Sequence, residues 1–198
     1  MTILNFNNAN KVLVIGPIYD NFEILLKIEK LVNQYDRVIF NGSLTYPLDN
    51  FKTCQRLEHM SDLLKLEKVI YNISDIDYKL SMTNNMVADW LKHKPNAVNI
   101  KFNRGTSVLI ISGGISPEMK QYKDLESNLE LSFVKEINNK SWHYSYNGRF
   151  GYVVSNNLLS EEEPKFFNYS AQIGIKHDKG KVYAQEINEN GLGNTFLL

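Results

Sequence analysis

A short apolar run that stops at two glycines is the sequence feature that most restricts the fold. Val108 to Ile111 form an apolar run that fits a buried strand and falls far below the roughly 18 residues of a membrane-spanning helix. Gly113 and Gly114 follow, and paired glycines permit positive φ angles and the close approach of another segment. Pro117 then suits the first turn of a helix, because that position needs no backbone N–H donor. A strand, a glycine turn and a helix in this order are typical of the sites of α/β folds.

The first half of the chain predicts buried strands that alternate with helices. Strands are expected at residues 11–15, 37–42 and 69–71. The segments between and after them show the 3.6-residue apolar period of amphipathic helices. We expect these helices at residues 21–32, 49–66 and 82–92.

The second half favours strands. Residues 97–102 and 107–112 predict a hairpin with a glycine-containing turn, and a helix is expected at 118–135. Further strands are expected at residues 151–155, 166–175 and 181–187, with 178–180 as a hairpin turn between the last two. This order predicts an α/β fold in which two packed β-sheets are flanked by helices.

Length and composition fit one domain. The 198 residues predict a single domain over residues 1–198, and the polar, asparagine-rich residues 1–10 predict a loose end. Lys+Arg 22 against Asp+Glu 22 gives no indication of nucleic-acid binding. The single cysteine, Cys54, excludes an intramolecular disulfide and a cysteine-based zinc cluster. No signal-peptide pattern and no long apolar run are present, which predicts a cytoplasmic protein that does not span a membrane.

The opening stretch also carries a family resemblance. Ser112-Gly-Gly-Ile-Ser-Pro-Glu118 resembles the His-Gly-Gly-Ile-Ser-Pro-Glu segment of the calcineurin-like metallophosphatases, in the branch of the phosphoprotein phosphatases and diadenosine tetraphosphatases. The resemblance spans residues 11–187 and implies a four-layer α/β/β/α sandwich. In that family the histidine of this segment binds one of two catalytic metal ions, which together activate water and clamp a phosphate.

The other strand-end turns match the family in position but not in chemistry. Gly16-Pro-Ile-Tyr-Asp-Asn21 stands where the family has Gly-Asp-x-His-Gly-Asn, and Asn41-Gly-Ser-Leu-Thr-Tyr-Pro47 where it has Gly-Asp-x-x-Asp-Arg. Tyr71-Asn-Ile-Ser74 stands where it has Gly-Asn-His-Glu or Gly-Asn-His-Asp, and Asn156 would match the last histidine. By this resemblance, most residues at the family's functional positions are replaced: Pro17, Tyr19, Ser43, Pro47, Ile73, Ser112 and Asn156. Only the asparagine ligand remains, as Asn72.

These replacements predict a catalytically inactive relative. Proline and isoleucine can neither ligate a metal ion nor transfer a proton. We therefore expect no catalytic residue, no bound metal and no cofactor, and a binding or regulatory role that uses the former active-site cleft or another surface. The residues expected to line that cleft converge because each follows the end of a strand: Pro17, Tyr19, Asp20, Ser43, Tyr46, Asn72, Ile73, Ser112, Gly113 and Asn156.

Two alternatives stay open at the level of the sequence. In the first, the protein is a divergent metal-dependent phosphoesterase in which Asp20, Asn72, Asp75 and Asp77 hold one hard cation such as Mg²⁺ or Mn²⁺. In the second it has a structural or assembly role, as a homo-oligomer formed through the strand-rich C-terminal half. The sequence selects no partner for either.

Other catalytic motifs are absent from the sequence. It contains no Walker-type glycine loop, no His-Glu-x-x-His pair and no cysteine–histidine nucleophile pattern. His143 stands between Trp142 and Tyr144 and could line a pocket, but its aromatic neighbours favour packing.

Overall fold

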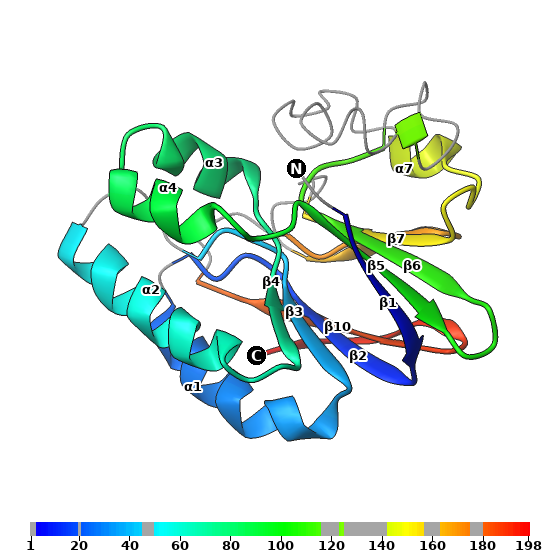
Figure 1. The fold of residues 1–198 in the computed structure, drawn as a ribbon. Helices are drawn as coiled ribbons and strands as arrows, with labels where there is room; N and C mark the ends of the chain where they lie inside the picture. The colour runs from blue at the N-terminus through cyan, green and yellow to red at the C-terminus, as the bar shows by residue number, and fades with distance from the viewer. Residues whose placement is uncertain are drawn as a thin grey trace.

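The computed structural model describes seven stretches of the chain. They are residues 3–19, 21–44, 50–115, 123–124, 142–156, 163–174 and 180–198. Two β-sheets pack face to face in these stretches, with helices on the outer sides (Figure 1). The predicted architecture of two packed sheets flanked by helices is therefore confirmed.

The five-stranded sheet has the order β11-β10-β2-β3-β4. Its parallel part consists of β2, β3 and β4, and β10 runs antiparallel to both β2 and β11. The strands are β2 (Lys11–Ile15), β3 (Arg37–Phe40), β4 (Val69–Tyr71), β10 (Tyr183–Asn188) and β11 (Gly191–Leu197).

The six-stranded sheet has the order β1-β5-β6-β7-β9-β8. Its centre, β6, β7 and β9, is parallel, whereas β5 pairs antiparallel with β6 as the predicted hairpin. The strands are β1 (Ile3–Ala9), β5 (Ala97–Phe102), β6 (Ser107–Ile111), β7 (Tyr152–Ser155), β8 (Lys165–Phe166) and β9 (Ser170–Gln172).

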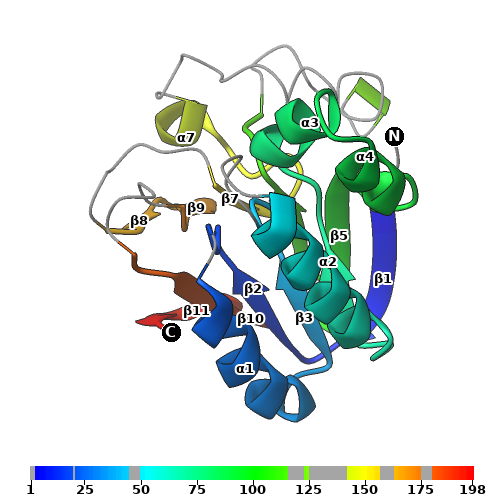
Figure 2. The ribbon, with the colours of Figure 1, turned by 90° about the vertical axis from the view of Figure 1, so that its left-hand side faces the viewer.

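Most of the helices cover the outer face of the five-stranded sheet, and Figure 2 shows α1 and α2 in front of it. They are α1 (Phe22–Leu31), the 3₁₀ turn η1 (Val32–Gln34), α2 (Asn50–Leu64), α3 (Asp75–Ser81) and α4 (Asn85–Leu91). The short α7 (Trp142–Ser145) packs on the outer face of the other sheet. In the part of the chain that the structure describes, no helix is long and apolar enough to cross a membrane.

Alternation along the strands assigns each side chain to one layer. In β2, Leu13 and Ile15 pack against the helices, while Val12 and Val14 face the other sheet. Strands buried on both faces need continuous apolar runs, which is why the sequence showed them without polar interruptions. The apolar core between the sheets is mostly aliphatic. The buried Gln185 is paired with Val14, so it lies on the same face of the sheet as this core.

The N-terminal segment is not loose, and the prediction for residues 1–10 was wrong. β1 forms a parallel edge strand on β5, and Phe6 packs against the core between the sheets. An asparagine of β1 is hydrogen-bonded to one on β5: the Asn99 amide donates to Asn5 Oδ1 at 3.0 Å. Asparagine is uncommon in strands, so this exposed edge gave no strand signal in the sequence.

Three local predictions also need correction. The strands predicted at residues 166–175 and 181–187 do not form a hairpin, because β9 and β10 belong to different sheets, and β10 instead turns back into β11. The helix expected at residues 82–92 begins at Asn85, where the Asn84 side chain caps it. Residues 142–145 form a helix in the half that was expected to be strand-rich. The helix predicted at 118–135 and the turn residue 178 lie outside the described residues, apart from residues 123–124.

His143 is buried in the small core beneath α7, as its aromatic neighbours predicted. It is 2% exposed and stacks between Trp142 and Phe167, with ring-centroid distances of 3.7 and 4.7 Å. Its Nδ1 lies 2.8 Å from Ser170 Oγ, while Nε2 lies 3.4 Å from Ser155 Oγ. Burial lowers the pKa of His143 from 6.5 to about 3.

The buried imidazole predicts acid sensitivity. The unfolded chain protonates His143 near pH 6.5 and the folded chain only near pH 3, so the unfolded state binds more protons between these values. The free energy of unfolding therefore falls as the pH drops through this range, by about 1.4 kcal/mol per pH unit from this group. Urea denaturation of wild type and His143→Gln between pH 7 and pH 4 measures the difference in slope. His93→Gln, at an exposed site, is the matched control, and equal slopes for His143→Gln and wild type would contradict the prediction.

Candidate functional site

Several strand ends meet at one edge of the two sheets. β2, β3 and β4 are parallel within one sheet, and β6 and β7 are parallel within the other. Hydrogen bonds connect the turns that follow these strands, both within each sheet and between the sheets. These turns carry the residues that were predicted to line the cleft.

The turns after β2 and β3 lie against each other. The N–H groups of Ile18 and Tyr19 donate to the Ser43 carbonyl oxygen at 3.1 and 3.0 Å, and Pro17 is buried in the same turn. Tyr19 and Ser43 have φ angles of 45° and 58°, a left-handed conformation that costs a non-glycine residue roughly 1–2 kcal/mol. Pro17, Tyr19 and Ser43 therefore come together as predicted, while Asp20 and Tyr46 lie outside the described residues.

Three buried asparagines join the two sheets. The Asn72 amide donates to Asn41 Oδ1 at 2.7 Å, and the Asn41 amide donates to the Ile111 carbonyl oxygen at 2.8 Å and to Asn156 Oδ1 at 3.3 Å. The Asn156 amide returns a hydrogen bond to the Asn41 carbonyl oxygen. Asn41 and Asn72 are fully buried, and Asn156 is 8% exposed. We call this set, Asn41, Asn72 and Asn156, the asparagine bridge.

The remaining cleft residues flank the bridge. Ser112 is buried, and its carbonyl oxygen accepts a hydrogen bond from the Asn156 N–H at 3.2 Å. Gly113 follows it and is half-buried. The Ile73 side chain is buried, and its N–H donates to the Pro95 carbonyl oxygen at 2.9 Å. Ser112 and Ile73 therefore lie beside Asn156 and Asn72, so the glycine turn after β6 belongs to this edge.

A second polar group fixes the turn after β3 to α3. Ser74 and Asp77 form a capping box at the start of α3, and the Ser43 N–H donates to Ser74 Oγ at 2.9 Å and to Asp77 Oδ2 at 3.0 Å. The Tyr71 hydroxyl donates to the Asp77 carboxylate at 2.8 Å. Burial raises the pKa of Asp77, and the hydrogen bonds from Ser74, Ser43 and Tyr71 act in the opposite direction. Asp77, which the sequence offered as a metal ligand, has both carboxylate oxygens engaged as a helix cap.

Gly42 makes this docking sterically feasible. Its φ angle is 81°, and an added Cβ would overlap the backbone and side chain of Ser74. Gly114 has a related role in the turn after β6, because a Cβ there would overlap the Trp142 ring. The close approach expected at the glycine pair is thus confirmed at Gly114, whereas the glycines with positive φ lie elsewhere in the chain.

The described residues do not fit a two-metal centre. Pro17 and Ile73 offer no side-chain donor, and the asparagine amides are hydrogen-bonded to one another and to backbone carbonyls. Among the described residues, no group of three His, Cys, Asp or Glu side chains lies close enough to hold a metal ion. Asn72 Oδ1 is buried and has no hydrogen-bond partner among the described residues, so a cation or a water molecule could use it as an acceptor.

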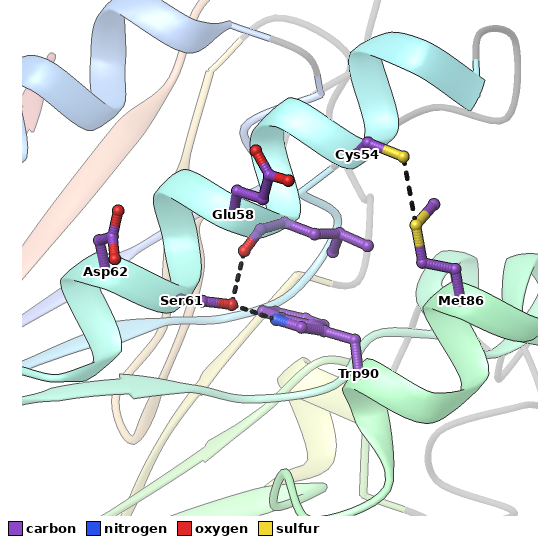
Figure 3. Close-up of a pocket in the computed structure, with 7 residues that line it drawn as sticks. Cys54, Glu58, Ser61, Asp62, Met86 and Trp90 are labelled. Atoms are coloured by element: carbon purple, nitrogen blue, oxygen red, sulfur yellow. Dashed lines mark hydrogen bonds between the residues drawn. The ribbon is translucent and has the colours of Figure 1, made fainter.

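A separate pocket lies between α2 and α4, on the outer side of the molecule (Figure 3). It has a volume of about 630 Å³ and is lined by Cys54, Leu57, Glu58, Ser61, Asp62, Met86 and Trp90. The Trp90 indole N–H donates to Ser61 Oγ at 2.9 Å, and the Ser61 hydroxyl donates to the Leu57 carbonyl oxygen at 2.7 Å. None of the predicted cleft residues lines this pocket.

Sequence reasoning missed Asn41, and it offered Asp77 as a metal ligand only under the alternative of a metal-dependent phosphoesterase. Asn41 ends a strictly apolar strand and precedes a glycine, and a lone amide in that place could have been recognised as a buried hydrogen-bonding group. Ser74 and Asp77 have the spacing of a capping box, a signal that was already present in the sequence. Which groups these side chains contact depends on the opposite sheet, and the sequence does not indicate that.

Comparisons with known proteins agree with this geometry. No protein-family model matches the sequence, and no curated protein does. Among solved structures, a candidate diadenosine tetraphosphatase superposes with a TM-score of 0.63 at 14% identity, covering 99% of this chain and 98% of that chain. A serine/threonine phosphatase from Saccharomyces cerevisiae has a TM-score of 0.65 at 13% identity, with coverages of 99% and 82%.

A third similar structure is a cold-active protein tyrosine phosphatase from a psychrophilic Shewanella species. It superposes with a TM-score of 0.58 at 13% identity, covering 100% of this chain and 83% of that chain. The chain has the calcineurin-like metallophosphatase fold, as the resemblance at residues 112–118 implied. Identities this low establish the fold and not the activity.

We predict that Asn41→Ala destabilises the protein by about 3 kcal/mol. It leaves the buried Asn72 amide, Asn156 Oδ1 and the Ile111 carbonyl without the Asn41 side chain as their partner, and each such buried group costs roughly 1–3 kcal/mol. Urea denaturation measures the change. Asn103→Ala, which removes an exposed asparagine hydrogen bond, is the control and is expected to stay within about 0.5 kcal/mol of wild type. An Asn41→Ala protein as stable as the control would show that the bridge does not hold the sheets together.

Proposed function

We propose that this chain is a catalytically inactive protein of the metallophosphatase fold with a binding or regulatory role. The binding surface is the edge where the strand ends meet, or another surface of the same domain. The observation that carries the proposal is the asparagine bridge. Neutral amides hydrogen-bonded to one another connect the two sheets at the edge where the family resemblance puts the metal ligands.

The chemistry of the flanking residues supports this proposal. Two-metal hydrolysis needs several carboxylate or imidazole ligands around a water and a phosphate. At this edge, Ile73 occupies the position that the resemblance gives to a proton donor, and Pro17 occupies that of a ligand. Neither side chain can bind a metal ion or transfer a proton.

A metal-dependent phosphoesterase remains the second candidate, because Asn72 Oδ1 lacks a hydrogen-bond partner. An amide oxygen is a suitable ligand for Mg²⁺ or Mn²⁺, but one amide alone does not hold a divalent cation. In this reading Asp20, which lies outside the described residues, and Asp75 would supply the charge. The cap at Asp77 weighs against the full ligand set that the sequence offered.

A structural or assembly role is the third candidate. Phe166 and Tyr169, in the strand-rich half, are 50% and 43% exposed, and Tyr144 on α7 is 73% exposed. Exposed aromatic side chains are common at protein interfaces, so a homo-oligomer through this half stays part of the proposal. The single cysteine, Cys54, which cannot form an intramolecular disulfide, is compatible with the cytoplasmic location that we also propose.

We predict no metal-dependent hydrolysis of phosphate esters. The assay incubates purified protein and Mn²⁺ with p-nitrophenyl phosphate or diadenosine tetraphosphate, and follows product release against a blank without protein. Asn72→Ala, purified in the same way and checked for folding by circular dichroism, reveals any contaminating phosphatase. We expect wild type and Asn72→Ala to release product no faster than the blank. Turnover that requires metal and disappears in Asn72→Ala would overturn the proposal.

We also predict that chelation does not change stability. A ligand that binds only the folded state raises the free energy of unfolding by RT ln(1 + [L]/Kd). A protein that binds no metal receives no such stabilisation from metal ions, so we expect EDTA to leave the melting temperature unchanged. Differential scanning fluorimetry in EDTA, in Mg²⁺ and in Mn²⁺ measures this. A melting temperature that falls by several degrees in EDTA and recovers with added metal would establish a metal site and favour the phosphoesterase reading.

A further inference from the structure

A small pocket with basic side chains adjoins the strand-end edge. It lies among α3, α4 and the start of β5, and its volume is about 400 Å³. Figures 1 and 2 show α3 and α4 side by side on this part of the molecule. The residues that matter for its chemistry are Ile73, Tyr78, Lys92, Lys94 and Asn96. Through Ile73 the pocket borders the turn that carries Asn72.

Lys94 brings a positive charge without a neutralising partner. It is half-buried, and its ammonium lies 4.9 Å from the centre of the Trp90 ring. In the described part of the chain Lys94 makes no ion pair, whereas its neighbour Lys92 is paired with Asp89 at 2.6 Å. Burial lowers the pKa of Lys94, because the charged form loses part of its hydration. An anion in the pocket would restore that stabilisation.

Asn96 presents its amide to this pocket. The residue is 3% exposed and lines the pocket, and its side chain makes no hydrogen bond to the described part of the chain. Its polar atoms are not among the enclosed, unpartnered side-chain atoms of the described residues, so water or a ligand in the pocket can reach them. The amide can donate two hydrogen bonds, as an oxyanion requires.

The end of α4 does not account for this arrangement by itself. Lysines near the last turn of a helix are stabilised by its carbonyl groups, which would explain Lys92 and Lys94 as an ordinary helix ending. That explanation leaves the buried Asn96 amide without a role. A charge and a hydrogen-bond donor that line one pocket are better explained together than separately.

We propose that this pocket binds a small molecule through an oxyanion group, a carboxylate or a phosphate. The Lys94 ammonium supplies the charge and the Asn96 amide supplies directed hydrogen bonds. The buried side chains of Ile73 and Leu91 provide apolar walls for the rest of the ligand. Since Ile73 also belongs to the strand-end edge, a ligand here would lie beside the surface proposed above for binding.

This proposal extends the proposed binding role and can fail separately from it. The phosphatase assay measures turnover, whereas the experiment below measures occupancy of one pocket. An anion could bind at Lys94 whether or not the protein hydrolyses phosphate esters. Equally, loss of binding here would leave the argument from the asparagine bridge unchanged.

Tryptophan fluorescence offers a direct test. The chain has two tryptophans. Trp90 contacts the Lys94 ammonium, whereas Trp142 is buried in α7 on the outer face of the six-stranded sheet. Inorganic phosphate and citrate are titrated separately at constant ionic strength, with NaCl as the balancing salt. We expect at least one of them to give a saturable change in fluorescence, and the responding anion identifies the preferred group. The side-chain amide signals of Asn96 in a ¹⁵N NMR titration are expected to shift over the same concentrations.

Matched variants connect the response to the pocket. Lys94→Met keeps the length of the side chain and removes its charge, so we expect binding at least tenfold weaker. Lys101→Met removes an exposed lysine on β5 and is expected to bind as wild type does. Circular dichroism confirms that both variants are folded. No saturable response in either fluorescence or NMR, or equal affinities for Lys94→Met and wild type, would overturn the proposal.

Discussion

The structure depends on how polar groups are satisfied where two apolar sheets come together. The core between the sheets is mostly aliphatic, so a polar atom buried at its end must find a partner inside the protein or lose its hydration without compensation. Asn41, Asn72 and Asn156 meet this demand by bonding to one another and to the ends of β6. Because the partners come from both sheets, the same hydrogen bonds fix how the sheets sit relative to each other.

This solution has a chemical consequence. Buried carboxylates at such an edge would repel one another and would need cations to be stable, whereas neutral amides need only complementary donors and acceptors. Asp77, a buried carboxylate nearby, accepts hydrogen bonds from Ser43, Ser74 and Tyr71 and caps α3. Hydrogen bonds also hold the described strand-end turns, including the left-handed Ser43. Among the described residues, no group of three His, Cys, Asp or Glu side chains could hold a metal ion, which agrees with the binding role proposed for this chain.

Two side chains that make no ion pair or hydrogen bond in the described part of the chain lie near this edge, in the pocket among α3, α4 and the start of β5. Lys94 and Asn96 stand at the connection between α4 and β5, and the Pro95 carbonyl between them accepts the Ile73 N–H. A ligand in that pocket would therefore lie beside a backbone segment that is hydrogen-bonded to the turn after β4. In the pocket between α2 and α4, by contrast, the Trp90 indole and the Ser61 hydroxyl are hydrogen-bonded within the protein.

The sequence by itself determined the central elements and the fold class. Continuous apolar runs as short as those at β2, β3 and β6 are typical of strands buried on both faces, and the glycine turns after them indicate one common edge. It also determined that Pro17 and Ile73 cannot serve as ligands, because their side chains carry no donor atom. The sequence did not predict the edge strand β1, because an asparagine-rich edge strand has no apolar run. It also did not predict that β9 and β10 lie in different sheets, because the sequence of a turn does not indicate which sheet the next strand joins. Only the tertiary structure decided that Asn41 joins Asn72 and Asn156, because hydrogen bonds between residues up to 115 positions apart depend on the packing of two sheets and not on any local pattern.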